Sequence, residues 1–516
     1  MNDHIKKYLR FYKAAMMALL PLVLCVITSA LQGFSILDVY IPASEWNDEL
    51  FYFKQVESII EYGFPYGYFG FNESYAKLLS FAAWSPVLVW PWLVWGLLFG
   101  WNLLSPIYAN IAFMMISMFV FVWIVKPTWQ QLCKLAILYS LFTPFTRYMM
   151  SAMPECICFG MLIIFFASAI AYLRQESRGH LIALFVNSSL LTLMRPYLIV
   201  FMVLPICFWI YKHKWKGALG SAVIIAITGA MYAWIKVYLG AEYFTELYNL
   251  SWVKAFFTDG IFGGIRYTLY KLYVSGWDFF GKCYQGFTTG LASGAYFIGF
   301  LVVLTILLVY TGYTLYKKNY KHAILYGHLA FSFIAMWVAL LLMYKMTEGS
   351  KHLVTFIAVG IFALAMMEVK KPIQIGVASI VFIYLYMVMA IDPYDYQVPY
   401  RTDELVAQIE QVEVDLDAQL VLETDQVPTF DNTVIWVFSD LVLETYQVTD
   451  WQILYSLPVG FGVSCSYEGF IIENFDELAS KYICIVQGGV IEQMCIERDL
   501  TKITSGIDSV IYQLRD

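Results

Sequence analysis

The sequence predicts an α-helical membrane protein of about eleven spans followed by a small α/β domain, and three observations predict this class. The 516 residues are 60% hydrophobic and only 14% charged, with a mean hydropathy of +0.65. Apolar runs of about 20 residues, enough to cross a hydrocarbon core, recur as far as residue 391. Charge is unevenly divided: residues 1–391 hold 27 Lys and Arg against 16 Asp and Glu, whereas residues 392–516 hold 5 against 23. We therefore expect a membrane part at 1–391 and an acidic domain at 392–516.

The apolar runs predict the spans in chain order. They are 14–36, 103–125, 131–150, 156–173, 181–194, 198–211, 217–238, 290–316, 322–344, 352–367 and 373–391. The first run is too long for a signal peptide and lacks a cleavage pattern of small residues, so we interpret it as a retained anchor. Arg195-Pro196 separates the fifth run from the sixth, because Pro breaks a helix. The Trp-rich segment 84–99 is interpreted as an interfacial or partly inserted outer helix, since a span there would invert every later loop.

Basic residues gather in alternate loops, which the positive-inside rule assigns to the cytoplasm. The clusters are Lys6, Lys7, Arg10 and Lys13; Lys126 and Lys134; Arg174 and Arg178; Lys212, Lys214 and Lys216; Lys317, Lys318 and Lys321; Lys370 and Lys371. The N-terminus is then cytoplasmic, and the first loop 37–102 and the acidic domain are extracytoplasmic. The chain is thus predicted to be a multi-pass protein of the cell membrane. Basic charge scattered in short loops also argues against nucleic acid as a partner.

The acidic domain contains four strand-like runs, TVIWVF, YSLPVGFGVSC, KYICIVQG and SVIYQL, with a helical stretch at ENFDELAS. This order predicts a small extracytoplasmic α/β domain. Cys465, Cys484 and Cys495 either form one disulfide or remain unpaired packing residues. No nucleotide-binding GxxxxGK[ST] pattern, HExxH or paired CxxC occurs in the chain, so these motifs give nucleotide hydrolysis and structural zinc no support.

The first outer loop concentrates acidic residues near the membrane surface, where ionisable groups are costly unless they serve a site. Asp48 and Glu49 open the segment NDELFYFKQVESIIEYG, which is typical of a helix lying on the bilayer. Asp48 at that position suits a helix N-cap, and it also suits a catalytic carboxylate. The two roles are compatible.

The order of short motifs resembles the GT-C superfamily of integral membrane glycosyltransferases, which includes lipid A aminoarabinose transferases and protein O-mannosyltransferases. The matching features are an acidic pair after the first span, Asp48-Glu49; a Pro-containing aromatic segment at Trp84-Ser85-Pro86; an acid in the next outer loop, Glu155; a basic residue ending the fifth span, Arg195; and a late basic pair, Lys351-His352. The resemblance covers the whole chain in architecture, including the small outer domain.

The resemblance implies a polyprenyl-phosphate sugar as donor, whose leaving group needs positive charge, and an acceptor hydroxyl, which needs a base. Asp48, with Glu49 beside it, is the catalytic candidate. Glu155 either holds Mg²⁺ or Mn²⁺ jointly with Asp48, orients the acceptor, or merely sits favourably at a helix start. Arg195 is a candidate for binding a phosphate or pairing with an acidic residue.

Lys351 and His352 are further candidates for binding the donor phosphate. The alternative is that Lys351 only extends its ammonium group to the membrane surface and that His352 is an ordinary interfacial histidine with its hydrogen bonds satisfied. Relatives place His or Lys where this chain has Ser85, so Lys77 is the substitute candidate there. Lys351 stands where relatives have Arg. Its single ammonium group cannot form the two parallel hydrogen bonds that a guanidinium makes to a phosphate.

The sequence therefore predicts a membrane glycosyltransferase that moves a sugar from a polyprenyl-phosphate donor to an extracytoplasmic glycan, lipid or protein. Two alternatives remain. A flippase or transporter of lipid-linked sugars is expected to carry ionisable residues at mid-span and internal repeats. An O-antigen-type polymerase or ligase is expected to place its functional loop late, as the loop 239–285 would allow.

Overall fold

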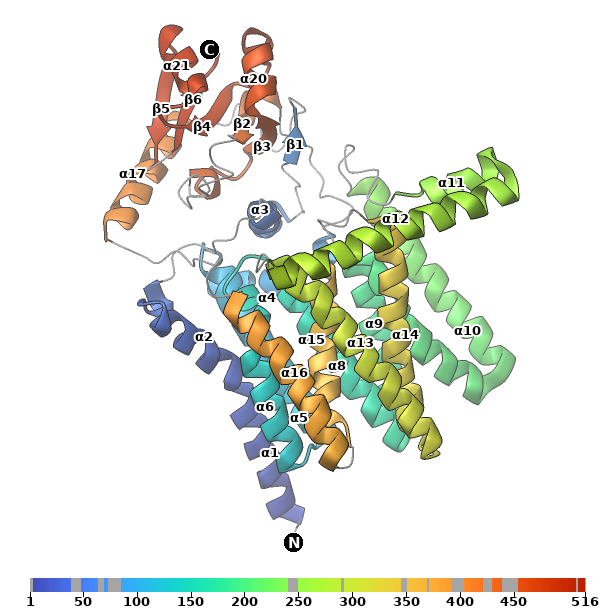
Figure 1. Cartoon of the computed structure of the whole chain (residues 1–516). Helices are drawn as coiled ribbons and strands as arrows, with labels where there is room; N and C mark the ends of the chain where they lie inside the picture. The colour runs from blue at the N-terminus through green and yellow to red at the C-terminus, as the bar shows by residue number, and fades with distance from the viewer. Residues whose placement is uncertain are drawn as a thin grey trace.

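The computed structural model describes residues 3–38, 48–63, 69–72, 85–239, 249–288, 292–344, 350–368, 371–391, 403–420, 429–438, 453–506 and 509–515. It contains a helical bundle with a small sheet domain above it (Figure 1), in agreement with the predicted fold class. Its helices in the N-terminal part are α1 (Asp3–Ala18), α2 (Leu20–Leu31), α3 (Asp48–Tyr62), α4 (Trp90–Phe99), α5 (Ser105–Val125), α6 (Trp129–Leu141), α7 (Pro144–Met149), α8 (Glu155–Gln175), α9 (Arg178–Met194), α10 (Val203–Tyr238), α11 (Ser251–Thr258), α12 (Gly260–Thr288), α13 (Ala292–Tyr316), α14 (Tyr320–Met343), α15 (Ser350–Met366) and α16 (Lys371–Ile391).

Within the described residues, helices lie in each of the predicted spans, with several local differences. The run 14–36 is divided between α1 and α2, which ends at Leu31, and residues 198–202 of the sixth run belong to a 3₁₀ helix. The run 131–150 is divided into α6 and α7, because Pro144 begins a new helix at its first position. The runs 198–211 and 217–238 share α10, which folds back at Lys214, a residue with left-handed φ of 54°. By length and composition, six described stretches suffice to cross a membrane: Lys7–Leu31, Ser105–Val125, Glu155–Gln175, Pro196–Tyr238, Gly294–Tyr316 and Tyr320–Met343. The count of eleven spans and their orientation stay predictions.

The segment 84–99 folds as the 3₁₀ helix η2 (Pro86–Val89) followed by α4. It is apolar but shorter than the six long stretches. Ser85 is buried, and its hydroxyl accepts a hydrogen bond from the Val87 amide, so it caps η2. Whether this segment lies at the interface stays a prediction.

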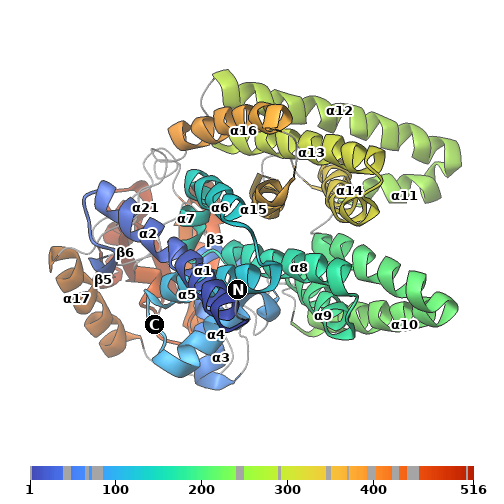
Figure 2. The same cartoon turned by 90° about the horizontal axis from the view of Figure 1, so that it is seen from below.

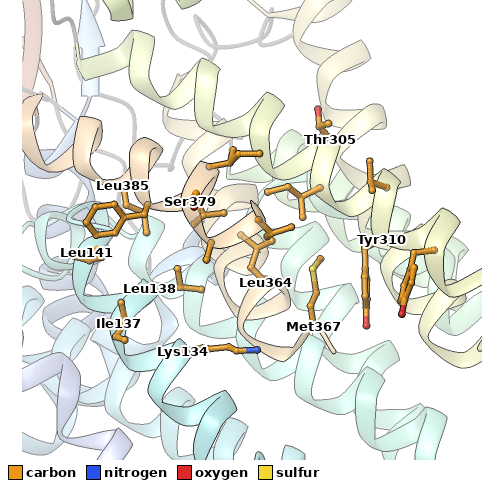
Figure 3. A pocket seen from close by; sticks show the side chains of 18 residues that line it. Lys134, Ile137, Leu138, Leu141, Thr305, Tyr310, Leu364, Met367, Ser379 and Leu385 are labelled. Carbon is orange, nitrogen blue, oxygen red and sulfur yellow. The ribbon is translucent and has the colours of Figure 1, made fainter. Parts of the chain in front are cut away.

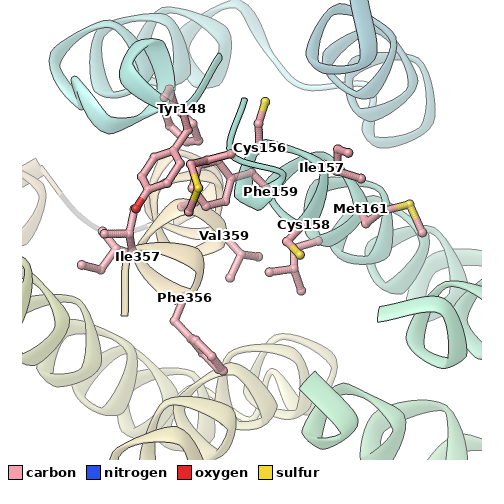
Figure 4. Packing of buried hydrophobic residues seen from close by; sticks show 14 of the residues in the cluster. Tyr148, Cys156, Ile157, Cys158, Phe159, Met161, Phe356, Ile357 and Val359 are labelled. Atoms are coloured by element: carbon pink, nitrogen blue, oxygen red, sulfur yellow. The ribbon is translucent and has the colours of Figure 1, made fainter. Parts of the chain in front are cut away.

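Helix α8 is the centre of the bundle. Figure 2 shows it between α5 and α9, and α15 packs against it as well. Figure 4 shows the packed layer that α8 and α15 share, which includes Phe159, Phe356 and Val359. A Cβ added at Gly160 would lie 2.6 Å from Phe113 and Ser117 of α5. The missing side chain therefore lets these two helices approach closely.

The two ends of the bundle differ in charge. At one end, which we call the basic end, Lys13 Nζ donates to the Pro127 carbonyl at 3.1 Å and Arg174 donates to the Val125 carbonyl. Helix α8 carries Arg174 in its last turn and begins with Glu155. A helix of that length is about 30 Å long, so Glu155 lies at the opposite end of the bundle, which faces the sheet (Figure 1).

The sheet has six strands in the order β1-β3-β2-β4-β6-β5, parallel among the first four and antiparallel beyond β4. The strands are β1 (Phe69–Phe71), β2 (Thr433–Phe438), β3 (Gly462–Tyr467), β4 (Tyr482–Val486), β5 (Thr501–Ser505) and β6 (Ser509–Gln513). Helices α17 (Asp403–Gln419), α20 (Glu468–Asn474) and α21 (Val490–Glu497) accompany them.

The four predicted strand runs coincide with β2, β3, β4 and β6, although β3 begins late in its run. The helical stretch predicted at ENFDELAS is confirmed in part: α20 ends at Asn474, the 3₁₀ helix η6 (Phe475–Glu477) follows, and residues 478–480 are not helical. All nine cysteines are free thiols, so the alternative of unpaired packing cysteines is the one observed.

Strand β1 comes from the first outer loop and not from the acidic domain. It pairs in parallel with β3, placing Phe69 opposite Val463 and Phe71 opposite Cys465. The Asn72 amide continues the ladder by donating to the Cys465 carbonyl at 2.9 Å. The loop and the C-terminal sheet are therefore joined by main-chain hydrogen bonds, while the division of the chain at residue 391 stays a prediction.

Candidate functional site

Helix α3 lies between the bundle and the sheet (Figure 1). Its residues Leu50 to Val56 are all buried, which is unlike a helix exposed on a bilayer surface. Asp48 is its first residue. Position 48 is one turn before Tyr52, and residues four apart share a helix face. The Asp48 side chain itself lies outside the described part of the structure.

Arg195 is the centre of a buried polar cluster next to α3. It ends α9 with extended backbone, as expected before Pro196, and the chain then turns into the 3₁₀ helix η3 (Pro196–Met202). Its Nη2 donates to Glu155 Oε1 at 2.6 Å and to the Tyr52 hydroxyl at 3.0 Å. Arg195 is 4% exposed and Glu155 is 1% exposed. Three elements distant in sequence therefore meet at one guanidinium.

His352 joins this cluster through Tyr197. The His352 Nδ1 atom lies 3.1 Å from the Tyr197 hydroxyl oxygen, and the two rings pack with centroids 4.8 Å apart. Tyr344 also packs against the imidazole, with a centroid distance of 5.0 Å, and its ring lies 6.4 Å from that of Tyr197. Because Tyr197 follows Arg195 by two residues, the start of α15 is brought beside the end of α9. We call Tyr52, Glu155, Arg195, Tyr197 and His352 the arginine cluster.

The segment that presents Glu155 is fixed by a buried amide. Asn110 of α5 accepts a hydrogen bond from Trp92 Nε1 at 2.8 Å and donates to the Ser151 carbonyl at 2.9 Å. Its side chain is fully buried, so these bonds are made away from water. These bonds hold α4, α5 and the turn before α8 together. They thereby fix the position of Glu155, the first residue of α8.

Glu49 lies on another face of α3 and contacts the sheet domain instead of the arginine cluster. It is 2% exposed and interacts electrostatically with Tyr455. Burial, and then the Glu49 charge, raise the pKa of Tyr455 well above its usual value. Phe53 stacks edge-on against Tyr455 with ring centroids 5.0 Å apart.

Further contacts fasten α3 to the segment before β3. Lys54 Nζ donates to the Leu457 carbonyl at 2.6 Å and forms an ion pair with Glu57 at 2.8 Å. The Tyr62 hydroxyl donates to the Val459 carbonyl at 3.2 Å. The acidic domain thus forms part of the surroundings of α3, the helix that carries the predicted base.

Of the predicted site residues, the structure brings Glu155, Arg195 and His352 together and places Glu49 apart from them. Lys77 and the side chain of Lys351 lie outside the described residues, although Lys351 is in the first turn of α15. Sequence reasoning missed Tyr52, Tyr197 and Tyr455. The chain has 39 tyrosines, so the presence of one at a given position does not indicate a functional site. The available signals were weak: Tyr52 lies four residues after Asp48, and Tyr197 two after Arg195.

The predicted divalent cation finds little support in this environment. Glu155 already has its charge balanced by the Arg195 guanidinium, which would repel a neighbouring cation. Within the described ranges, no three His, Cys, Asp or Glu side chains converge to hold a metal ion. The described residues alone thus supply no complete ligand set for Mg²⁺ or Mn²⁺. Joint binding by Asp48 and Glu155 stays a prediction.

Comparison with known proteins identifies the fold. No family model matches the chain, and no curated protein matches it in sequence. The structure of ArnT from Cupriavidus metallidurans bound to undecaprenyl phosphate is similar, with a TM-score of 0.52 at 11% identity over 97% of both chains. An apo oligosaccharyltransferase from Archaeoglobus fulgidus gives a TM-score of 0.50 at 11% identity, over 94% of this chain and 70% of that one. The chain therefore has the fold of the GT-C membrane glycosyltransferases.

Proposed function

We propose that this protein is a membrane glycosyltransferase that transfers a sugar from a polyprenyl-phosphate donor to an acceptor hydroxyl outside the cytoplasm. The acceptor is a cell-envelope glycan, a lipid or a protein. The observation that carries the proposal is the position of Arg195. It is a buried guanidinium next to α3, in the fold shared with an enzyme whose structure contains undecaprenyl phosphate.

The arginine cluster suits a lipid phosphate. Guanidinium, imidazole and two phenol groups supply several hydrogen-bond donors at one place. Glu155 keeps Arg195 oriented and balances its charge while no phosphate is bound. Lys351, in the first turn of α15, adds a further cation at a helix start, where main-chain amides favour an anion.

The reaction assigns separate tasks to α3 and to the cluster. The acceptor oxygen attacks the anomeric carbon, its proton passes to the Asp48 carboxylate, and the bond from the anomeric carbon to the phosphate oxygen breaks. Polyprenyl phosphate leaves with the bonding electrons, and positive charge from the cluster stabilises the oxygen on which negative charge develops. Glu49, packed beside Tyr455, helps to hold the first turn of α3 in place, and its own catalytic role stays a prediction.

The transporter alternative is less well supported. A transporter is expected to carry its ionisable groups near the middle of its spans. Here Glu155 begins α8 and Arg195 ends α9, so both lie at helix ends on the side of the sheet. That side would meet a lipid headgroup and a water-borne acceptor.

The test separates the base from the phosphate site. Undecaprenyl phosphate is the binding probe, and transfer is followed as loss of labelled sugar from polyprenyl-phosphate donors in host membranes. Asp48→Asn should bind the probe normally and lose transfer by about a hundredfold or more, the usual contribution of a general base. Glu61→Gln, an exposed carboxylate late in the same helix, is the matched control and should be fully active.

Arg195→Lys with His352→Gln should weaken binding of undecaprenyl phosphate, because bidentate donation and the imidazole are both lost. Full transfer by Asp48→Asn would exclude this base. Unchanged probe binding by the double variant would exclude the phosphate site, whatever the activity of Asp48→Asn.

A further inference from the structure

A second candidate site lies far from the arginine cluster, between α6, α13, α15 and α16. It is a cavity of about 680 Å³, within the range of small-molecule sites in proteins. Figure 3 shows its walls, which are formed mostly by aliphatic side chains such as Leu138, Leu364 and Leu385. Close packing of Tyr384 against Gly299, where any Cβ would clash, holds α16 to α13 beside it.

The apolar walls indicate what fills the cavity. Apolar cavities in proteins stay dry, because water finds no hydrogen-bond partners there. An unfilled cavity of this size would also forfeit many dispersion contacts along its walls. In a bilayer the neighbouring molecules are lipids, so acyl chains are the available apolar filling.

One end of the cavity is polar: Lys134 lines it, and Glu368 directly follows the lining residue Met367. Figure 3 shows the Lys134 amino group and the Tyr310 hydroxyl at the same end. Lys134 is half-buried and makes no hydrogen bond or ion pair with any residue that the structure describes, but it feels the charge of Glu368. The Glu368 carboxylate accepts a bond from Gln131 at 3.4 Å, and its main-chain amide donates to Tyr310 at 3.1 Å.

This polar end is the basic end of the bundle. Lys134 lies in the second turn of α6, which starts just after Pro127, the residue that Lys13 contacts. The arginine cluster lies at the other end of α8, about 30 Å away by the length of that helix. The headgroup of a donor lipid bound at Arg195 therefore cannot also occupy this place.

We propose that the cavity binds one zwitterionic phospholipid of the phosphatidylethanolamine type from the leaflet at the basic end. The lipid phosphate pairs with Lys134, the lipid ammonium pairs with Glu368, and an acyl chain lies between α13 and α16. Lys134 and Glu368 lie near the same mouth of the cavity. They are complementary in charge to a headgroup that contains a negative phosphate and a positive ammonium. A purely anionic headgroup would meet Glu368 with like charge.

Native mass spectrometry of the full-length protein tests this proposal after delipidation and exposure to equal amounts of phosphatidylethanolamine, phosphatidylglycerol and phosphatidylcholine. The wild type should retain one phosphatidylethanolamine in preference to the other two. Lys134→Gln should reduce retention about fivefold, the order expected for one exposed ion pair. Lys126→Gln, which changes an exposed Lys at the same end outside the cavity, should not.

Glu368→Gln supplies the sharper test, because it should shift the preference from phosphatidylethanolamine towards phosphatidylglycerol. Ser379→Trp should fill the cavity and prevent retention, whereas Ile116→Trp on the exposed face of α5 should leave retention unchanged. Melting temperatures of the variants separate loss of lipid from loss of fold. Equal retention of all three lipids by the wild type, or retention by a folded Ser379→Trp variant, would overturn the proposal.

Discussion

At the residue scale, the central feature is the buried pair of Arg195 and Glu155. Burying two charges costs free energy that their mutual attraction barely offsets, so such a pair is a poor source of stability. Removing one partner is much worse, since it leaves the other charge buried alone. The pair is thus better explained by a task for the guanidinium than by folding. Stability and activity should respond differently when both members are replaced.

We expect Arg195→Met to destabilise the protein by about 3 to 5 kcal/mol, because it leaves Glu155 as an unpaired buried charge. The double variant Arg195→Met with Glu155→Gln should recover most of that stability and none of the transfer activity. Thermal unfolding in detergent and the donor-consumption assay provide the two readouts. If the double variant were active, Arg195 would serve only to neutralise Glu155.

The same cluster shows how far the sequence predicts a site. Glu155, Arg195 and His352 were predictable because their order along the chain matches the short motifs of the GT-C resemblance. Tyr52 and Tyr197 were not, since a phenol at a span end is ordinary in an aromatic-rich membrane protein. The position of Glu49 was also not predictable, because only the packing of α3 against the sheet domain places this carboxylate beside Tyr455.

At the element scale, the contact between α5 and α8 depends on Gly160. A methyl group there would meet the Phe113 ring and the Ser117 hydroxyl at 2.6 Å, so the helices must shift. Gly160→Ala should therefore lower the free energy of unfolding by about 1 to 3 kcal/mol. Gly312→Ala is the control, because a Cβ in α13 meets open space there and Ala favours a helix. A melting temperature that rises in both variants would contradict the close approach.

Helix α3 is fastened to the sheet domain by Lys54, which is 5% exposed. Lys54→Met keeps the aliphatic shape but removes the bond to the Leu457 carbonyl, worth about 1.5 to 3 kcal/mol for a charged donor. Amide hydrogen exchange should accelerate about tenfold or more in α3 and in residues 453–461. Lys502→Met, on an exposed residue of β5, should leave those rates unchanged. Exchange confined to α3 alone would mean that the two parts are not coupled.

At the scale of the whole molecule, hydropathy predicts where the helices of the bundle lie, because each predicted apolar run falls on helical residues, although the runs and helices do not match one to one. The order of the sheet could not be predicted. Strand β1 has only three residues, too few to show an alternating pattern, and its partner lies in the other half of the charge distribution. Helix α17 was also missed, although its apolar residues Leu405, Ile409, Val412 and Leu416 recur at helical spacing among the acidic ones. It docks on β5 through the bond from Gln419 to the Ile503 carbonyl at 3.0 Å.

The pairing of β1 with β3 also fixes the order in which the protein can be completed on the ribosome. β1 is synthesised with the first outer loop, whereas β3 emerges only after the last membrane helix. A nascent chain with its helices already inserted still lacks the strand that β1 pairs with and the carbonyl that Lys54 contacts. The first outer loop therefore reaches its final structure only after residues 457 to 467 have been synthesised, and a chain truncated before them has an unpaired β1 and an unsupported α3.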